Sequence, residues 1–217
     1  GGVNRWDIRT NATGLAEFST GGNSYNLTKV GANYFPLVSA NVDAALGDVD
    51  VQSGGFGYEF WTSGLGDPTK TLNVASNAYF LMYGALNPLD KHVRLQGGAQ
   101  FRSQNASNTI WGPVNLPGGW ASILTDVNLT LTNEVSGAGS LEKSGTNTLY
   151  LNAANTFTGT LLVTNGALTA THPDALGANR LVTIRYGTVT GGSGTRLGLA
   201  GNIVTPASVA AHFITTT

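Results

Sequence analysis

Cysteine is absent from this chain of 217 residues, and charged residues are scarce. The lack of cysteine excludes disulfides, thiolate metal sites and cysteine nucleophiles. Asp, Glu, Lys and Arg together make up only 11% of the residues, against about 25% in ordinary globular domains. With a formal net charge of −1, the chain has neither a basic nucleic-acid footprint nor an acidic tail. We therefore expect no nucleic-acid partner.

Long apolar runs are also missing. The longest, from Ala78 to Leu86, is interrupted by Gly84 and falls far short of the ~20 residues of a membrane helix. The first residues lack the charged and apolar regions of a signal peptide. We expect residues 1–217 to form a single unit that does not span a membrane and that is part of a longer chain.

Glycine and threonine are abundant, at 30 and 27 residues, which is typical of a β-rich chain with many turns. Apolar residues recur with a period of two, as in Val127, Leu129 and Leu131, and glycine-rich breakers separate such segments. This alternation predicts ten or more short strands, each with one face buried. The best helical candidate is the short segment from Pro206 to Phe213.

Two internal similarities distinguish between all-β architectures. Residues 27–33 resemble residues 141–147, and residues 43–47 resemble residues 173–177, at different offsets. A solenoid tolerates such variable spacing because each coil contacts only its neighbours. We predict a parallel β-solenoid with a degenerate repeat over about 27–60 and a clear one over about 139–190. The alternative is an antiparallel β-sandwich, and residues 162–168 alone also fit a β-hairpin.

The clear repeat has a recognisable pattern. It runs from Gly139 to Leu151, continues through Asn-Thr-Phe-Thr-Gly at 155–159, and ends with Val-Thr-Asn-Gly-Ala-Leu at 163–168. This pattern resembles the autotransporter-associated β-strand repeat, also called the passenger-associated transport repeat, of bacterial surface and autotransporter passenger proteins. The resemblance implies a right-handed parallel β-helix that is exported and displayed outside the cell.

The repeat also makes physical sense from its residues. We expect six side chains to point inward and to stack on their equivalents in adjacent coils: Leu141, Leu149, Leu151, Phe157, Val163 and Leu168. We further expect Asn155 to stack in a ladder with asparagines of adjacent coils. At about 20–25 residues per coil, the chain would form about nine or ten coils.

Carboxylates offer one weak catalytic hypothesis. Asp48 and Asp50 lie two residues apart on one outward strand face, with Asp43 as the nearest further carboxylate. Such a pair could serve as acid and base in polysaccharide cleavage or bind calcium, although calcium requires six to eight oxygens. With Arg94 they are the best candidates for an enzyme site, and a solvated strand face explains them better.

Cations and histidines give a second weak hypothesis. His92, Arg94 and Arg102 could form a cationic strip across adjacent strands for the acidic groups of a glycan, although scattered surface charges explain them as well. His172 and His212 have no metal-binding spacing. We assign no catalytic, cofactor-binding or metal-ligating residue, and we expect no cofactor.

Aromatic residues concentrate in the first 120 residues. Exposed, they would form stacking platforms for sugar rings, but large aromatics are mostly buried, and we expect burial here. The set comprises Trp6, Trp61, Trp111, Trp120, Tyr25, Tyr34, Tyr58, Tyr79 and Tyr83.

These features favour a non-enzymatic, extracellular structural or adhesive segment of a bacterial surface protein. It would act as a stalk, fibre subunit or autotransporter-like passenger that associates with copies of itself, end to end or side by side, or with a glycan or other surface ligand. The alternatives are a polysaccharide lyase or glycoside hydrolase built on a β-helix, and a carbohydrate-binding module.

Overall fold

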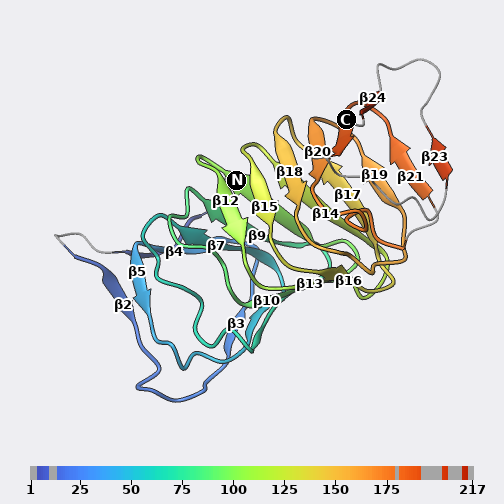
Figure 1. Cartoon of the computed structure of the whole chain (residues 1–217). Helices are drawn as coiled ribbons and strands as arrows, with labels where there is room; N and C mark the ends of the chain where they lie inside the picture. The colour runs from blue at the N-terminus through green and yellow to red at the C-terminus, as the bar shows by residue number, and fades with distance from the viewer. Residues whose placement is uncertain (1–3, 10–13, 179–180, 192–201, 205–211, 215–217) are drawn as a thin grey trace.

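The computed structural model describes residues 4–9, 14–178, 181–191, 202–204 and 212–214 (Figure 1). In these residues the chain forms an all-β parallel solenoid of about eight turns, without a helix. Every strand pair in the described part is parallel, as in β17 with β19, so the antiparallel sandwich is wrong. The helix expected from Pro206 to Phe213 lies mostly outside the described residues, and its last two residues belong to a strand.

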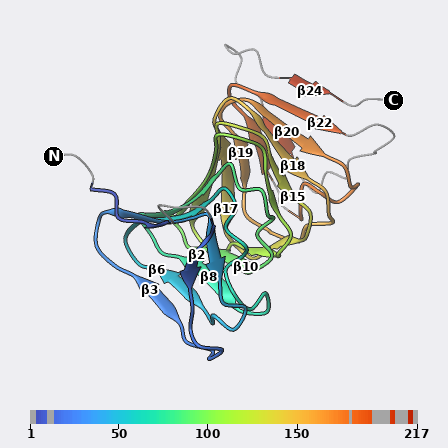
Figure 2. The same cartoon turned by 90° about the vertical axis from the view of Figure 1, so that its left-hand side faces the viewer.

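Three long sheets form the sides of the solenoid (Figures 1 and 2). Sheet A contains β1 (Ile8–Arg9), β4 (Tyr34–Val38), β7 (Gly54–Glu59), β9 (Ala78–Tyr83), β11 (Gln100–Gln104), β14 (Trp120–Thr125), β17 (Ser140–Ser144), β19 (Leu161–Val163), β21 (Leu181–Ile184) and β23 (Asn202–Val204). Sheet C contains β3 (Leu27–Lys29), β6 (Val49–Val51), β8 (Thr71–Val74), β10 (His92–Leu95), β13 (Val114–Asn115) and β16 (Val135–Ser136). Sheet D contains β12 (Asn108–Ile110), β15 (Leu129–Leu131), β18 (Thr148–Leu151), β20 (Ala167–Ala170), β22 (Thr188–Gly191) and β24 (His212–Ile214). A small sheet B pairs β2 (Ala16–Phe18) with β5 (Ala40–Val42).

The number of residues per coil agrees with the expected value of about 20–25. Gln100 pairs with Tyr79 in the preceding coil and with Ser122 in the following coil. The number of turns, about eight, is slightly lower than the expected nine or ten. At the start of sheet A the offset between paired strands is longer, with Ile8 paired to Leu37.

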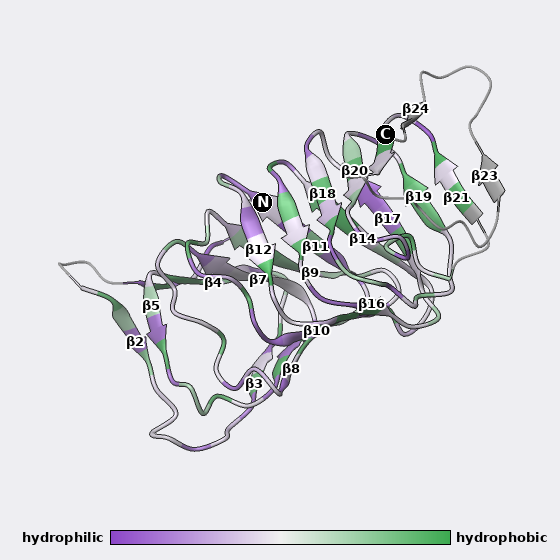
Figure 3. Ribbon diagram, viewed as in Figure 1, coloured by the Kyte–Doolittle hydropathy of each residue, from purple (hydrophilic) through white to green (hydrophobic). Residues whose placement is uncertain are grey.

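One apolar core runs along the inside of the solenoid, and hydrophobic residues alternate with hydrophilic ones along the strands (Figure 3). On sheet A, four phenylalanines stack coil on coil with ring centroids 5.4 to 6.0 Å apart: Phe35, Phe56, Phe80 and Phe101. The six side chains predicted to point inward from the clear repeat are all buried. Each contributes about 1.5–3 kcal/mol when fully buried.

The hairpin interpretation of residues 162–168 is wrong. β19 pairs with its neighbours in sheet A, whereas β20 belongs to sheet D. The turn at Gly166, with a φ of 68°, therefore forms a corner between two sheets. Positive φ is the reason that glycine suits this corner.

The internal similarity of residues 27–33 and 141–147 marks a repeated corner with a buried lysine. Lys143 Nζ donates to the carbonyl oxygens of Ser144, Gly145 and Asn165 at 2.8 to 3.0 Å. Lys29 Nζ makes the same three bonds, to residues 30, 31 and 53. The two corners follow strands of different sheets, so the similarity reflects a local carbonyl cradle and does not mark the same position in the coil.

The buried lysines predict an unusual pH dependence of stability. Burial lowers the pKa of Lys143 and of Lys91 to about 8, from about 10.4 in an unfolded chain. Between these values the unfolded state binds more protons, so the free energy of unfolding should increase with pH by up to about 1.4 kcal/mol per pH unit for each lysine. Denaturant titrations from pH 7 to pH 10 would measure this increase.

The control for this prediction is a second lysine variant. Lys143→Met should remove its share of the increase, whereas Lys70→Met should change it only slightly, since the charge of Lys70 is the smallest of the causes that act on the pKa of Lys91. Above about pH 10 the increase should end, because burial raises the pKa of Tyr58 and tyrosines of the unfolded chain ionise there. A free energy of unfolding that stays constant or decreases between pH 8 and pH 10 would contradict the burial of these lysine side chains.

The asparagine ladder expected at Asn155 is not formed. Asn155 is buried, and its Oδ1 accepts from Val135 N at 2.7 Å while its Nδ2 donates to Ala175 O at 2.5 Å. The side chain therefore bridges the backbones of the preceding and following coils. Asn108 also bonds to backbone groups, accepting from Ala85 N and donating to Met82 O, but both of these partners lie in the preceding coil.

Close contact between coils predicts that replacement by alanine destabilises the chain much more at one glycine than at another. A Cβ on Gly159 would lie 2.2 Å from the carbonyl oxygen of Gly139 in the preceding coil, whereas a Cβ on Gly118 would meet nothing within 4 Å. Gly159→Ala should therefore lower the free energy of unfolding by about 1–3 kcal/mol, and Gly118→Ala by less than about 0.5 kcal/mol. Thermal unfolding of both variants measures the difference, and equal losses would show that the coils are not this close.

Candidate functional site

The outer face of sheet C carries a continuous row of polar side chains. One residue from each of its six strands lies at a paired position: Thr28, Asp50, Asn73, Arg94, Asn115 and Ser136. The residues between them, such as Val49 and Val93, are buried in the core. The two-residue period of the strands therefore places hydrogen-bonding groups along the whole face.

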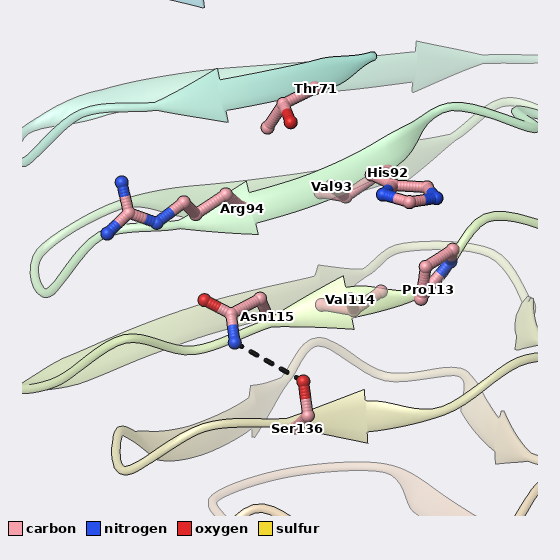
Figure 4. Close-up of a pocket in the computed structure, with 8 residues that line it drawn as sticks. All are labelled: Thr71, His92, Val93, Arg94, Pro113, Val114, Asn115 and Ser136. Carbon is pink, nitrogen blue, oxygen red and sulfur yellow. Dashed lines mark hydrogen bonds between the residues drawn. The ribbon is translucent and has the colours of Figure 1, made fainter. Parts of the chain in front are cut away.

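Two adjoining hollows follow this row. The first has a volume of about 400 Å³ and is lined by Asn26, Thr28, Asp48, Val49, Asp50, Thr71, Asn73 and Arg94. The second has a volume of about 210 Å³ and is lined by Thr71, His92, Val93, Arg94, Pro113, Val114, Asn115 and Ser136 (Figure 4). Because both include Thr71 and Arg94, they form one groove across the strands.

The structure brings Asp48 and Asp50 into this groove together with Arg94. Asp48 Oδ1 accepts from Thr71 N at 2.8 Å. Asp50 accepts from Asn73 Nδ2 at 2.7 Å and from Gln52 Nε2 at 2.8 Å. Both carboxylates therefore hold neighbouring groups of the groove in place.

Asp43 is not part of the groove. Its Oδ2 accepts from Thr20 N and Gly22 N, and its Oδ1 accepts from Ala45 N at 3.0 Å. The backbone hydrogen bonds from Ala45 and Gly22 lower its pKa. Asp43 therefore fixes a loop and does not add a ligand to the Asp48 and Asp50 pair.

His92, Arg94 and Arg102 do not lie together in one cationic strip. His92 and Arg94 are exposed on β10 in sheet C, and Figure 4 shows both extending from that strand. Arg102 lies on β11 in sheet A, with its guanidinium carbon 3.9 Å from the centre of the Tyr79 ring. The sequence did not reveal that a corner separates these strands.

His172 lies near one carboxylate and far from the groove in sequence. Its Nδ1 is 3.9 Å from Asp174 Oδ2 and accepts from Asp174 N. In the part of the chain that the structure describes, no group of three or more His, Asp or Glu side chains could hold a metal ion. The side chain of His212 lies outside the described residues.

The expected burial of the aromatic residues is wrong for all four tryptophans. Trp6, Trp61, Trp111 and Trp120 are between 47% and 67% exposed, as is Tyr25 at 63%. Tyr34 and Tyr58 are buried. The tryptophans lie at or just outside strand ends on separate coils, where the inward and outward alternation does not bury them, and no stacked ring pair in the described chain includes one.

Two features escaped the sequence analysis. One is the buried Glu59, which accepts from Tyr34 Oη at 2.6 Å and pairs with Arg5 at 2.9 Å. The other is a hollow on the outer face of sheet A that includes Tyr79 and Trp120. Only the register between coils brings these residues together, and no local pattern in the sequence signals it.

No helix in the described residues is long and apolar enough to cross a membrane. Comparison with protein-family models, with curated proteins and with solved structures gives no match for this chain.

Proposed function

We propose that this chain is a non-enzymatic structural and adhesive segment of an extracellular bacterial surface protein. It acts as a stalk, fibre subunit or autotransporter-like passenger whose stacked coils form a stiff rod. Its outer faces and ends contact copies of the same chain or a surface ligand. The resemblance of residues 139–168 to the autotransporter-associated repeat supports the extracellular location.

The uninterrupted pairing of the coils is the observation that carries this proposal. Sheet A runs through ten strands and sheets C and D through six strands each, around a core that extends from Leu37 to Val189. A solenoid of this kind spreads its stability over every interface between coils. Such a body suits a mechanical role because no single loop determines its shape.

The alternative, a polysaccharide-cleaving enzyme, has less support. Its best candidates, Asp48 and Asp50, accept hydrogen bonds from Thr71, Asn73 and Gln52. A carboxylate that orders its neighbours in this way is well suited to fixing the groove. Replacing both aspartates by Asn should therefore leave binding to any glycan unchanged within about twofold, and a loss of a measurable cleavage rate would favour the enzyme.

The edge strand β3 allows a direct test of self-association. β3 is the last strand in the order of sheet C, and Leu27 N and Lys29 O are already bonded to the β6 side. The N–H of Thr28 therefore faces the open edge, where a further strand can add. The unchanged chain should form filaments in electron microscopy, and Thr28→Pro, which removes this donor, should abolish them.

Thr28→Val provides the matched control, because it removes the hydroxyl group and keeps the N–H. Its filaments should persist. Dispersed particles of the unchanged chain at every concentration, or filaments that survive Thr28→Pro, would contradict end-to-end association through this edge.

A further inference from the structure

A third hollow lies on the outer face of sheet A, on a different side of the solenoid from the groove of sheet C. Its volume is about 350 Å³, within the range of about 300–1,000 Å³ that small-molecule sites occupy. Six of the residues that line it carry the argument: Tyr79, Gln100, Arg102, Trp120, Ser122 and Glu142.

Parallel register brings these residues together from four coils. Tyr79, Gln100, Ser122 and Glu142 are successive partners across β9, β11, β14 and β17. Trp120 lies two residues before Ser122 on the same strand and therefore on the same face. The small side chain of Ser122 leaves open space between the larger groups around it.

One wall of the hollow is held in place. The guanidinium of Arg102 lies 3.9 Å from the centre of the Tyr79 ring, and its Nε–H donates to Gln100 Oε1. The Tyr79 ring occupies the space above Gly55, where a Cβ would lie 2.1 Å from the ring. These contacts fix the wall before any ligand arrives, which reduces the entropy lost on binding.

Trp120 forms the opposite wall and is 47% exposed. Its carbonyl oxygen accepts from Gly98 N at 2.6 Å, and the neighbouring Gly119 carries no side chain to cover the indole. The backbone is thus fixed while the ring face stays accessible. An exposed indole on a rigid strand is a stacking surface of low conformational cost.

The polar groups around the hollow select the chemistry of the ligand. Glu142 Oε1 accepts from Thr164 at 3.3 Å, while Glu142 Oε2, Gln100 Nε2, Ser122 Oγ and the Arg102 Nη groups have no hydrogen bond within the described residues. One cation and one carboxylate balance each other. A ligand with several hydroxyl groups and no charge satisfies such a set of donors and acceptors.

We infer that this hollow is a binding subsite for an uncharged sugar ring, which stacks on Trp120 and bonds through its hydroxyls to Gln100, Arg102 and Glu142. The inference names the ligand class for the adhesive role and in that respect rests on the proposed function. The subsite itself depends only on the geometry of sheet A.

Fluorine NMR of the chain labelled with 5-fluorotryptophan tests the inference, because the four tryptophans give four signals. The probes are a panel of uncharged tetrasaccharides of glucose, mannose and N-acetylglucosamine, with tetragalacturonate as the charged comparison. At least one uncharged probe should shift the Trp120 signal selectively at up to about 10 mM, as expected for a millimolar Kd.

Variants complete the test. Binding by the variants is measured on the protons of the sugar probe by saturation-transfer NMR, because the Trp120 variants lack the fluorine signal. Trp120→Ala should weaken binding at least about tenfold, and Trp120→Tyr should retain most of it. Trp111→Ala, which removes an exposed indole elsewhere, should have no effect. No shift of the Trp120 signal with any probe, a preference for tetragalacturonate, or equal losses in Trp120→Ala and Trp111→Ala would overturn the inference. Since none of these outcomes alters filament formation, failure of the subsite is distinguishable from failure of the proposed rod.

Discussion

Replacing Leu151 by Asp should unfold the C-terminal coils. Leu151 is only 1% exposed, and it pairs with Leu131 and Ala170 in the inward row of sheet D. The substitution buries a carboxylate without a partner, and it also removes the packing of the leucine. We expect a loss of more than about 4 kcal/mol in the free energy of unfolding, measured by denaturant titration.

Ala154→Asp is the matched control, because Ala154 is exposed only three residues further along the chain. This variant should retain its stability within about 0.5 kcal/mol. If Leu151→Asp gave the same small change, the side chain would face solvent and the inward assignment of sheet D would be wrong.

Replacing Asn155 by Leu should have the second largest effect. The leucine is apolar and fits a buried position, but it leaves Val135 N and Ala175 O without their partners. A buried backbone group that loses its hydrogen bond costs about 1–3 kcal/mol. The expected loss in the free energy of unfolding is therefore about 2–5 kcal/mol, from calorimetry or denaturant titration.

Two further variants distinguish the loss of the hydrogen bonds of Asn155 from the general effect of replacing a polar side chain. Asn155→Asp keeps an acceptor for Val135 N and loses the donor to Ala175 O, so it should also be strongly destabilised. Asn152→Leu changes an exposed asparagine, whose Oδ1 accepts from Thr171 Oγ1 at 3.0 Å, and should cost less than about 0.5 kcal/mol. A stable Asn155→Leu variant would show that the bridge does not hold the coils together.

The architecture could be predicted from the sequence because its main determinants are local. Alternation such as Leu149 and Leu151 around Tyr150 specifies a strand with one buried face, and the similar segments at 27–33 and 141–147 specify a shared corner with a buried lysine. The same local reasoning predicted stacked asparagines at Asn155. It failed there because an amide can bond to the backbone of adjacent coils as well as to a like side chain, and only the three-dimensional spacing decides.

The candidate sites were predictable only in part. His92 and Arg94 belong to β10 and Asp50 belongs to β6, which Asp48 directly precedes. These residues lie on one face because β8 pairs with both strands. Arg102 lies apart from them because it belongs to sheet A, and a corner of the coil separates sheet A from sheet C. The hollow beside Trp120 joins four strands, and the coil lengths that bring them into register vary too much for the sequence to specify.

Distances between spin labels along one side of the solenoid test the central claim most directly. Thr109, Thr130, Tyr150, Thr169 and Thr190 are successive partners across sheet D, and the chain has no cysteine that would interfere with labelling at introduced cysteines. Label pairs from position 109 to positions 150, 169 and 190 should show separations that increase by about 4.8 Å per coil. Separations that do not increase with the number of intervening coils would contradict the parallel stack.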